Sequence, residues 1–200
     1  MKDIVYPDFE DPNHENKFNY LLDTTVFNRL VENKAWFLTV LNSLKKGFRY
    51  YITANQYNEL HGVGAKTYNQ NCVPHVHISD AFQEKIDLFD DILGRLHIKR
   101  LSSIASFMSN HWVLDGTYRI LDDTTACGKM TEELLAFNEK LRQRKPFAQH
   151  YDAMTAEAAM YHGCYLVSDD NDLGNIVNKY FPQKAIKTKD LIAIIQTQLR

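Results

Sequence analysis

Cysteine is scarce in this chain, and the few cysteines follow no pattern. Cys72, Cys127 and Cys164 are odd in number and lie far apart. A disulfide framework needs pairs of cysteines and a zinc ribbon needs closely spaced ones, so the sequence argues against both. Scattered thiols are typical of a reducing compartment, and we therefore expect a cytoplasmic protein.

Long apolar runs are also lacking. No segment approaches the roughly 18 consecutive apolar residues of a transmembrane helix, so we expect no membrane partner. Residues 1–17 are polar, contain Pro7 and Pro12, and lack the apolar stretch of a signal peptide. We expect these residues to form an extended or disordered arm.

An excess of positive charge is absent as well, because 23 Lys and Arg face 25 Asp and Glu and leave a net charge of −2. This balance argues against a basic protein that coats nucleic acid, although it is compatible with local basic patches. Hydrophobic residues make up 44% of the 200 residues, which is enough for a sizeable core. Residues 18–200 are therefore predicted to form a single domain.

Strand and helix patterns alternate at both ends of the chain. This alternation predicts an α/β fold with a parallel sheet flanked by helices. The segment from about 79 to 145 has mainly helical spacing, so we expect a long helical insertion at about 65–147. The expected strands are 18–22, 48–53, 164–168 and 185–188, and helices are expected from Thr24 and over 35–46, 54–64, 150–163 and 189–199.

Acidic residues occur at equivalent places relative to these elements. Asp23 ends the first strand, beside Thr24 as a ready N-cap, and Glu59 lies in the helix after the second strand. Asp152 opens an alanine-rich helix, and Asp170 follows the strand 164–168. Ligands of open parallel sheets bind at the edge where strands end and helices begin, so we expect these carboxylates to lie together there.

Carboxylates brought together repel one another unless a cation neutralises them. Mg²⁺ and Mn²⁺ are hard cations that prefer carboxylate oxygens and retain several water molecules. The sequence therefore predicts a site for one of these ions.

Four segments of the sequence belong together: "YLLDTTVFNRL", "YITANQYNEL", "YDAMTAEAAMYHGCYLVSDDNDL" and "AIKTKDLI". In this order they resemble the motifs of the PIN-domain family of metal-dependent ribonucleases. The resemblance covers about residues 18–64 and 148–198. It implies a PIN-like fold and an endoribonuclease that uses Mg²⁺ or Mn²⁺ to hydrolyse RNA phosphodiester bonds and leaves a 5′-phosphate. The family includes the toxins of bacterial toxin–antitoxin pairs.

The resemblance also implies roles for individual residues. Ser168 matches a hydroxyl position that helps to hold the reacting water, and Thr24 supports the site beside Asp23. Asp169 matches a variable position and is not counted as a ligand. Thr25 departs from the family, which often has Asn there, so the hydrogen bonds of that amide must be made differently or lost. The implied metal and catalytic residues are Asp23, Glu59, Asp152 and Asp170, with Asp172 as a more variable metal ligand.

Two basic segments lie between Glu59 and Asp152 in the sequence. "KLRQRK" carries Arg142, Arg144 and Lys145, which we expect to contact RNA phosphates. "HIKR", residues 97–100, is compatible with the same role or with a solvated helix end. RNA is thus the expected partner, and the resemblance adds a protein inhibitor of the antitoxin kind. A homodimer is a further candidate.

Two other functions stay open. A phosphatase of the haloacid-dehalogenase type would use Asp23 as a nucleophile and the acidic loop at 168–173 for its metal ion. That class usually has a second Asp two residues after the nucleophile, where this chain has Thr25. A catalytically silent PIN-like module would use the same fold only for binding.

Overall fold

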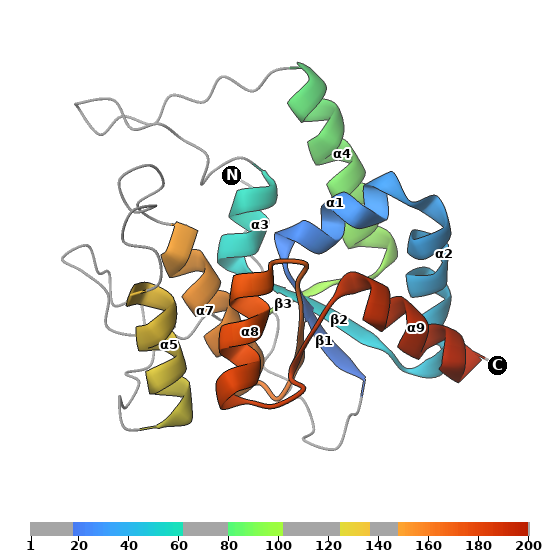
Figure 1. Ribbon diagram of the computed structural model, residues 1–200. Coiled ribbons are helices and arrows are strands. Elements are labelled where there is room, and N and C mark those ends of the chain that lie inside the picture. The colour runs from blue at the N-terminus through green and yellow to red at the C-terminus, as the bar shows by residue number, and fades with distance from the viewer. Residues whose placement is uncertain (1–17, 62–79, 102–124, 137–147, 200) are drawn as a thin grey trace.

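The computed structural model of the protein describes residues 18–61, 80–101, 125–136 and 148–199 (Figure 1). Its strands form a five-stranded, entirely parallel sheet in the order β3-β2-β1-β4-β5, which confirms the expected α/β fold. The strands are β1 (Asn19–Leu22), β2 (Arg49–Thr53), β3 (Lys99–Leu101), β4 (Tyr165–Val167) and β5 (Ala185–Ile186).

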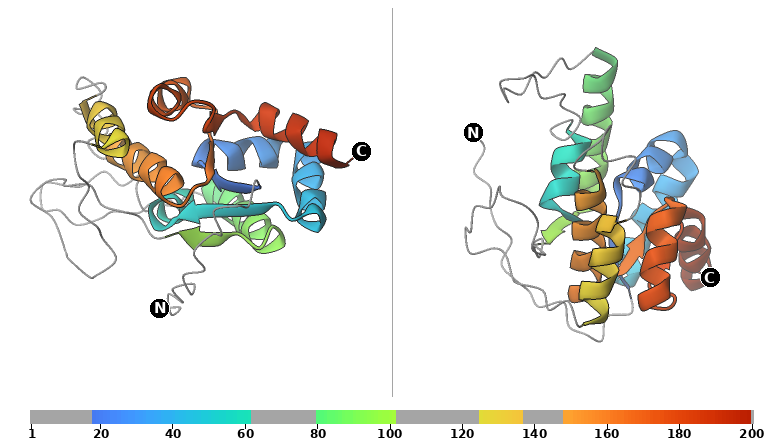
Figure 2. Two further views of the ribbon diagram at one scale, coloured as in Figure 1. Left: turned by 90° about the horizontal axis from the view of Figure 1, so that it is seen from below. Right: turned by 60° about the vertical axis from the view of Figure 1, so that its left-hand side comes forward.

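Helices lie on both sides of this sheet (Figure 2). None of the helices within the described ranges is long and apolar enough to cross a membrane. The helices are α1 (Thr24–Glu32), α2 (Lys34–Ser43), the 3-10 helix η1 (Leu44–Lys46), α3 (Ala54–Leu60), α4 (Asp80–Arg95), α5 (Ala126–Ala136), α7 (Ala148–Tyr161), α8 (Asn171–Tyr180) and α9 (Thr188–Leu199).

The central strand β1 is buried on both faces and separates two apolar cores. Tyr20 and Leu22 point to a core shared with α1, α2, α4 and α9. Leu21 points to the other core, which α5, α7 and α8 build together with β4. Side chains of a strand alternate between its faces, so one run of apolar residues in β1 serves both layers.

Local signals explain where the first elements end. Asn33 ends α1 and caps α2, because its Oδ1 accepts a hydrogen bond from the Trp36 N–H at 3.1 Å. Gly47 follows η1 with a φ of 87°, a left-handed conformation that costs glycine little and reverses the chain into β2.

Several sequence predictions need correction. The segment expected as a helical insertion also contains β3, an edge strand that pairs with β2, so part of it completes the sheet. Helix α5 begins at Ala126, within the segment of expected helical spacing, and Thr131 is a buried residue inside it. Helix α8 is absent from the expected helices, because Asp and Asn residues at its start are also typical of turns. The arm at 1–17 and the expected end of the helix 54–64 lie outside the described residues.

The conformation of Gly47 gives a stability prediction. A Cβ at this position would meet no atom within 4 Å, so the strain of Gly47→Ala comes from the positive φ alone. We expect Gly47→Ala to lower the free energy of unfolding by about 1 kcal/mol in urea denaturation.

Gly174, inside α8, is the matched control because a Cβ there also meets no atom within 4 Å. Gly174→Ala should raise the free energy of unfolding by up to about 1 kcal/mol. Equal effects of the two substitutions would contradict the conformational explanation.

Candidate functional site

The acidic residues lie close to the point where the order in which strands are added to the sheet reverses. From β1 the chain adds β2 and β3 on one side, and later β4 and β5 on the other. The switch point therefore lies between the carboxyl ends of β1 and β4, the usual ligand site of such sheets. The Asp23 N–H donates to the Val167 carbonyl at 2.9 Å, which joins the two strand ends there.

Asp23 is held rigidly at this switch point. It is the N-cap of α1, since its Oδ1 accepts a hydrogen bond from the Thr24 N–H at 2.8 Å. The expectation that Thr24 is the cap was wrong, because Thr24 is the first helical residue. Asp23 is 6% exposed, so its orientation depends on these protein groups rather than on solvent.

Two hydroxyl groups fix the other oxygen of Asp23. The Thr25 Oγ1 and Ser168 Oγ hydroxyls both donate to Asp23 Oδ2 at 2.7 Å. Each hydroxyl also accepts a backbone hydrogen bond at 3.1 Å, Thr25 from the Asp169 N–H and Ser168 from the Asp170 N–H. Thr25 thus links α1 to the loop after β4. Its hydroxyl makes hydrogen bonds at the position where the PIN-domain family often has an Asn side chain.

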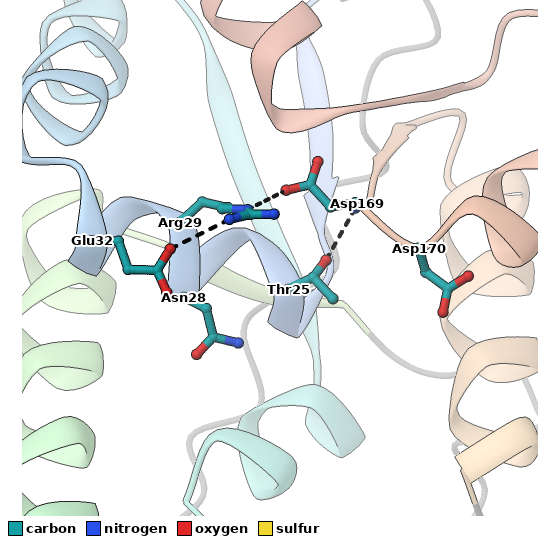
Figure 3. Close-up of a pocket in the computed structure, with 6 residues that line it drawn as sticks. All are labelled: Thr25, Asn28, Arg29, Glu32, Asp169 and Asp170. Atoms are coloured by element: carbon teal, nitrogen blue, oxygen red, sulfur yellow. Dashed lines mark hydrogen bonds and ion pairs between the residues drawn. The ribbon is translucent and has the colours of Figure 1, made fainter.

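Asp170 serves as the N-cap of α8 and borders the site. Its Oδ1 accepts hydrogen bonds from the Asp172 N–H at 2.8 Å and the Leu173 N–H at 3.1 Å. Its second oxygen takes no part in the cap, and the carboxylate points away from Asp169 and Arg29 (Figure 3). Asp172 lies exposed in the first turn of α8.

Asp152 shows that the predicted carboxylates converge. Burial, followed in order of effect by the charges of Asp23, Asp170 and Glu59, raises its pKa to about 8. These four residues come from α7, the end of β1, the start of α8 and α3, so distant parts of the chain meet here. Asp172 is not among the groups that raise this pKa, so nothing places it in the cluster.

The local sequence of α7 explains how Asp152 reaches the sheet. The helix packs small side chains inward, and four alanines on it are fully buried. Asp152 is the fifth residue of α7 and not the opening residue that the sequence predicted. The four alanines are Ala153, Ala156, Ala158 and Ala159.

Helix α3 brings Glu59 to the rim of the cluster. Thr53 and Gln56 form a capping box at its start, with the Thr53 N–H donating to Gln56 Oε1 at 2.7 Å. The buried Gln56 Nε2 also donates to the Leu22 carbonyl at 2.8 Å. Helix α3 is thereby tied to the residue before Asp23, while Glu59 itself is exposed.

The donor chemistry of the cluster fits Mg²⁺ or Mn²⁺, since the groups that face Asp152 are all carboxylates. Within the part of the chain that the structure describes, no three His, Cys, Asp or Glu side chains form a group that could hold a metal ion. Donor chemistry and the mutual repulsion of the carboxylates are the observations that support the fit.

Asp169 is directed to another partner than the carboxylate cluster. Its Oδ1 accepts from the Thr188 N–H and its Oδ2 from the Thr188 hydroxyl, both at 3.1 Å. Its Oδ2 also pairs with Arg29 Nε at 3.1 Å. Asp169 thus attaches the start of α9 and one face of α1 to the loop after β4.

A pocket of about 290 Å³ opens beside Asp170 (Figure 3). Four of its lining residues form a polar stripe on α1 at i, i+3, i+4 and i+7 spacing, and Asp169 and Asp170 complete the wall. Sequence reasoning used the apolar stripe of this helix and missed the polar one, although the spacing was readable. The stripe consists of Thr25, Asn28, Arg29 and Glu32.

The basic residues expected to contact RNA have different outcomes. Arg142, Arg144 and Lys145 lie outside the described residues. In the "HIKR" segment, Lys99 and Arg100 belong to β3, and the Arg100 guanidinium lies 3.5 Å from the centre of the Tyr57 ring. That segment is therefore part of the sheet and not a solvated helix end.

Comparisons with known proteins add little to this geometry. No protein-family model and no curated protein matches the chain. Among solved structures, the crystal structure of PAE2754 from Pyrobaculum aerophilum aligns with 14% sequence identity and a TM-score of 0.44, over 90% of each chain.

The tie between Gln56 and Leu22 gives a prediction about the frame of the site. Gln56→Leu removes the donor to the Leu22 carbonyl and the acceptor of the buried Thr53 N–H. We expect a loss of about 1–3 kcal/mol in the free energy of unfolding, measured by urea denaturation. Asn58→Leu, at an exposed position of the same helix, should change it by less than about 0.5 kcal/mol. A smaller effect at Gln56 than at Asn58 would contradict the role of this tie.

The raised pKa of Asp152 gives a prediction of pH dependence. Folded Asp152 keeps its proton up to a pKa of about 8, whereas an unfolded Asp loses it near pH 4. Unfolding therefore releases a proton between these values, and stability falls as the pH rises through them. Asp152→Asn removes this loss, so its stabilising effect in EDTA should grow from pH 4.5 to pH 8, as measured by thermal denaturation.

Asp172→Asn is the control for this series, because Asp172 is exposed and does not act on Asp152. Its effect should not grow between pH 6 and pH 8. A constant effect of Asp152→Asn across the whole range would show that Asp152 does not meet the other carboxylates.

Proposed function

We propose that the protein is a PIN-like endoribonuclease that hydrolyses RNA phosphodiester bonds with Mg²⁺ or Mn²⁺. The observation that carries the proposal is the effect of Asp23, Asp170 and Glu59 on Asp152. Four carboxylates at the switch point of a parallel sheet are costly unless a cation binds there or a proton stays. Stability alone does not favour such a cluster, so a function that uses the cation is the better explanation.

Asp23, Asp152 and Asp170 would hold the cation, and Glu59 would complete the site from α3. A divalent cation at this place supplies positive charge for a phosphoryl oxygen and acidifies water. In the reaction, the oxygen of a water molecule attacks phosphorus and the bond from phosphorus to O3′ breaks. The 3′ oxygen takes up a proton, and the other product carries a 5′-phosphate.

The surrounding residues prepare the carboxylates for this role. Thr25 and Ser168 donate to the same oxygen of Asp23, so one lone pair of Oδ1 stays available beyond the Thr24 N–H. Asp152 holds a proton near neutral pH and must lose it when a cation binds, so cation affinity should rise with pH.

The cellular setting is part of the same proposal. The scattered cysteines suit the cytoplasm. The resemblance to toxin-type ribonucleases suggests a protein inhibitor as a partner.

Asp170→Asn is the sharpest test of this function. Asn caps helices as well as Asp does, so the substitution keeps the acceptor for the Asp172 and Leu173 N–H groups and removes only the charge. We expect Mn²⁺-dependent cleavage of single-stranded RNA to fall by about 100-fold or more. The rise in melting temperature that Mn²⁺ gives the wild-type protein should shrink in parallel.

Asp87→Asn, on an exposed turn of α4, should leave both measurements unchanged. Cleavage that persists in EDTA and in Asp170→Asn would refute the proposal. Hydrolysis of a phosphate monoester in place of RNA, lost in Asp23→Asn, would instead support the phosphatase. Mn²⁺ stabilisation without cleavage of RNA or monoester would indicate the silent binding module.

A further inference from the structure

The pocket beside Asp170 is lined by both positively and negatively charged side chains. Of the six described residues that line it, Arg29 alone is a cation, while Asp170 belongs to the carboxylate cluster. An RNA strand carries a phosphate at every nucleotide, and the cluster repels phosphates unless a cation lies close by. A positive side chain at the rim of the cluster is therefore what an RNA substrate requires.

Arg29 is oriented for such a contact. Its Nε donates to Asp169 Oδ2 at 3.1 Å, and Asp169 is itself fixed by the backbone and the hydroxyl of Thr188. One edge of the guanidinium is therefore anchored. The NH1 group donates to Glu32 on the other side of the guanidinium, at 3.4 Å (Figure 3).

The contact with Glu32 is easy to exchange. The side chains of Arg29 and Glu32 are 54% and 64% exposed, and their 3.4 Å hydrogen bond is long for a charged pair. Exposed ion pairs on one helix contribute little, since water screens them. A phosphate offers the guanidinium two oxygens in a planar arrangement, a better partner than one carboxylate oxygen.

We propose that Arg29 binds a phosphate of the RNA strand in this pocket, next to the cleaved bond, and that Asp169 positions its guanidinium. This inference rests on the proposed ribonuclease function and adds the residue that holds the substrate. During binding, the phosphate replaces Glu32 while the Nε contact with Asp169 stays.

The test measures binding apart from cleavage. A fluorescein-labelled single-stranded RNA is titrated with protein in EDTA, and fluorescence anisotropy is recorded at several salt concentrations. Arg29→Gln should weaken binding about tenfold, as expected for one charged hydrogen-bonded contact. It should also lower the slope of log affinity against log salt by about one, because one phosphate contact is lost.

Two further variants complete the design. Arg29→Lys keeps the charge but loses the fork and the Nε anchor, so it should recover the salt slope and only part of the affinity. Lys45→Gln removes one exposed positive charge just before β2, near the amino end of that strand and not at the carboxyl ends where the cluster lies. This variant should bind RNA as the wild type does.

The inference is overturned if Arg29→Gln keeps the affinity and salt slope of the wild type, or loses no more than Lys45→Gln. It is also overturned if the wild-type protein does not bind the RNA at low salt. Loss of cleavage in Asp170→Asn with unchanged binding of Arg29→Gln would refute only the role of Arg29. Binding that depends on Arg29, without any cleavage, would refute only the ribonuclease.

Discussion

The hydrogen bonds to Asp23 are the interaction on which the site depends. This nearly buried carboxylate receives one backbone N–H and two hydroxyl groups, and each hydroxyl is in turn held by the loop after β4. The ends of β1 and β4 are thereby locked together by side chains as well as by the sheet. The positions of Asp170 and Asp169 follow from this lock, since both begin at the same loop.

The loop after β4 separates its two adjacent carboxylates into different tasks. Asp169 turns toward α9 and Arg29 and makes a structural contact, whereas Asp170 caps α8 and faces the cluster. Neighbouring residues of the same type thus differ in role because the backbone points them to opposite sides. A count of acidic residues in the sequence cannot make this distinction, although the resemblance to a family pattern suggested it.

Much of the fold was readable from the sequence, because β1, β2 and β4 are apolar or aromatic and helices follow them at once. The strand β3 was missed, since its three residues include Lys99 and Arg100 and show no apolar alternation. The proximity of Asp23, Asp152 and Asp170 was predictable from topology, because strand ends and the starts of helices share one edge. The pKa of Asp152 was not, since it depends on how deeply packing buries that side chain. The contact of Arg29 with Asp169 was not predicted, because the polar face of an amphipathic helix is usually only solvated.

The outer strands of the sheet are short, and this has a consequence for self-association. The strand β5 has two residues, and β3 has three with charged side chains at its start. Such edges offer few free backbone groups to a second sheet, a common protection against aggregation in open sheets. Pairing of edge strands between two copies of this chain would form few hydrogen bonds, so helix contacts are a more favourable interface for a dimer.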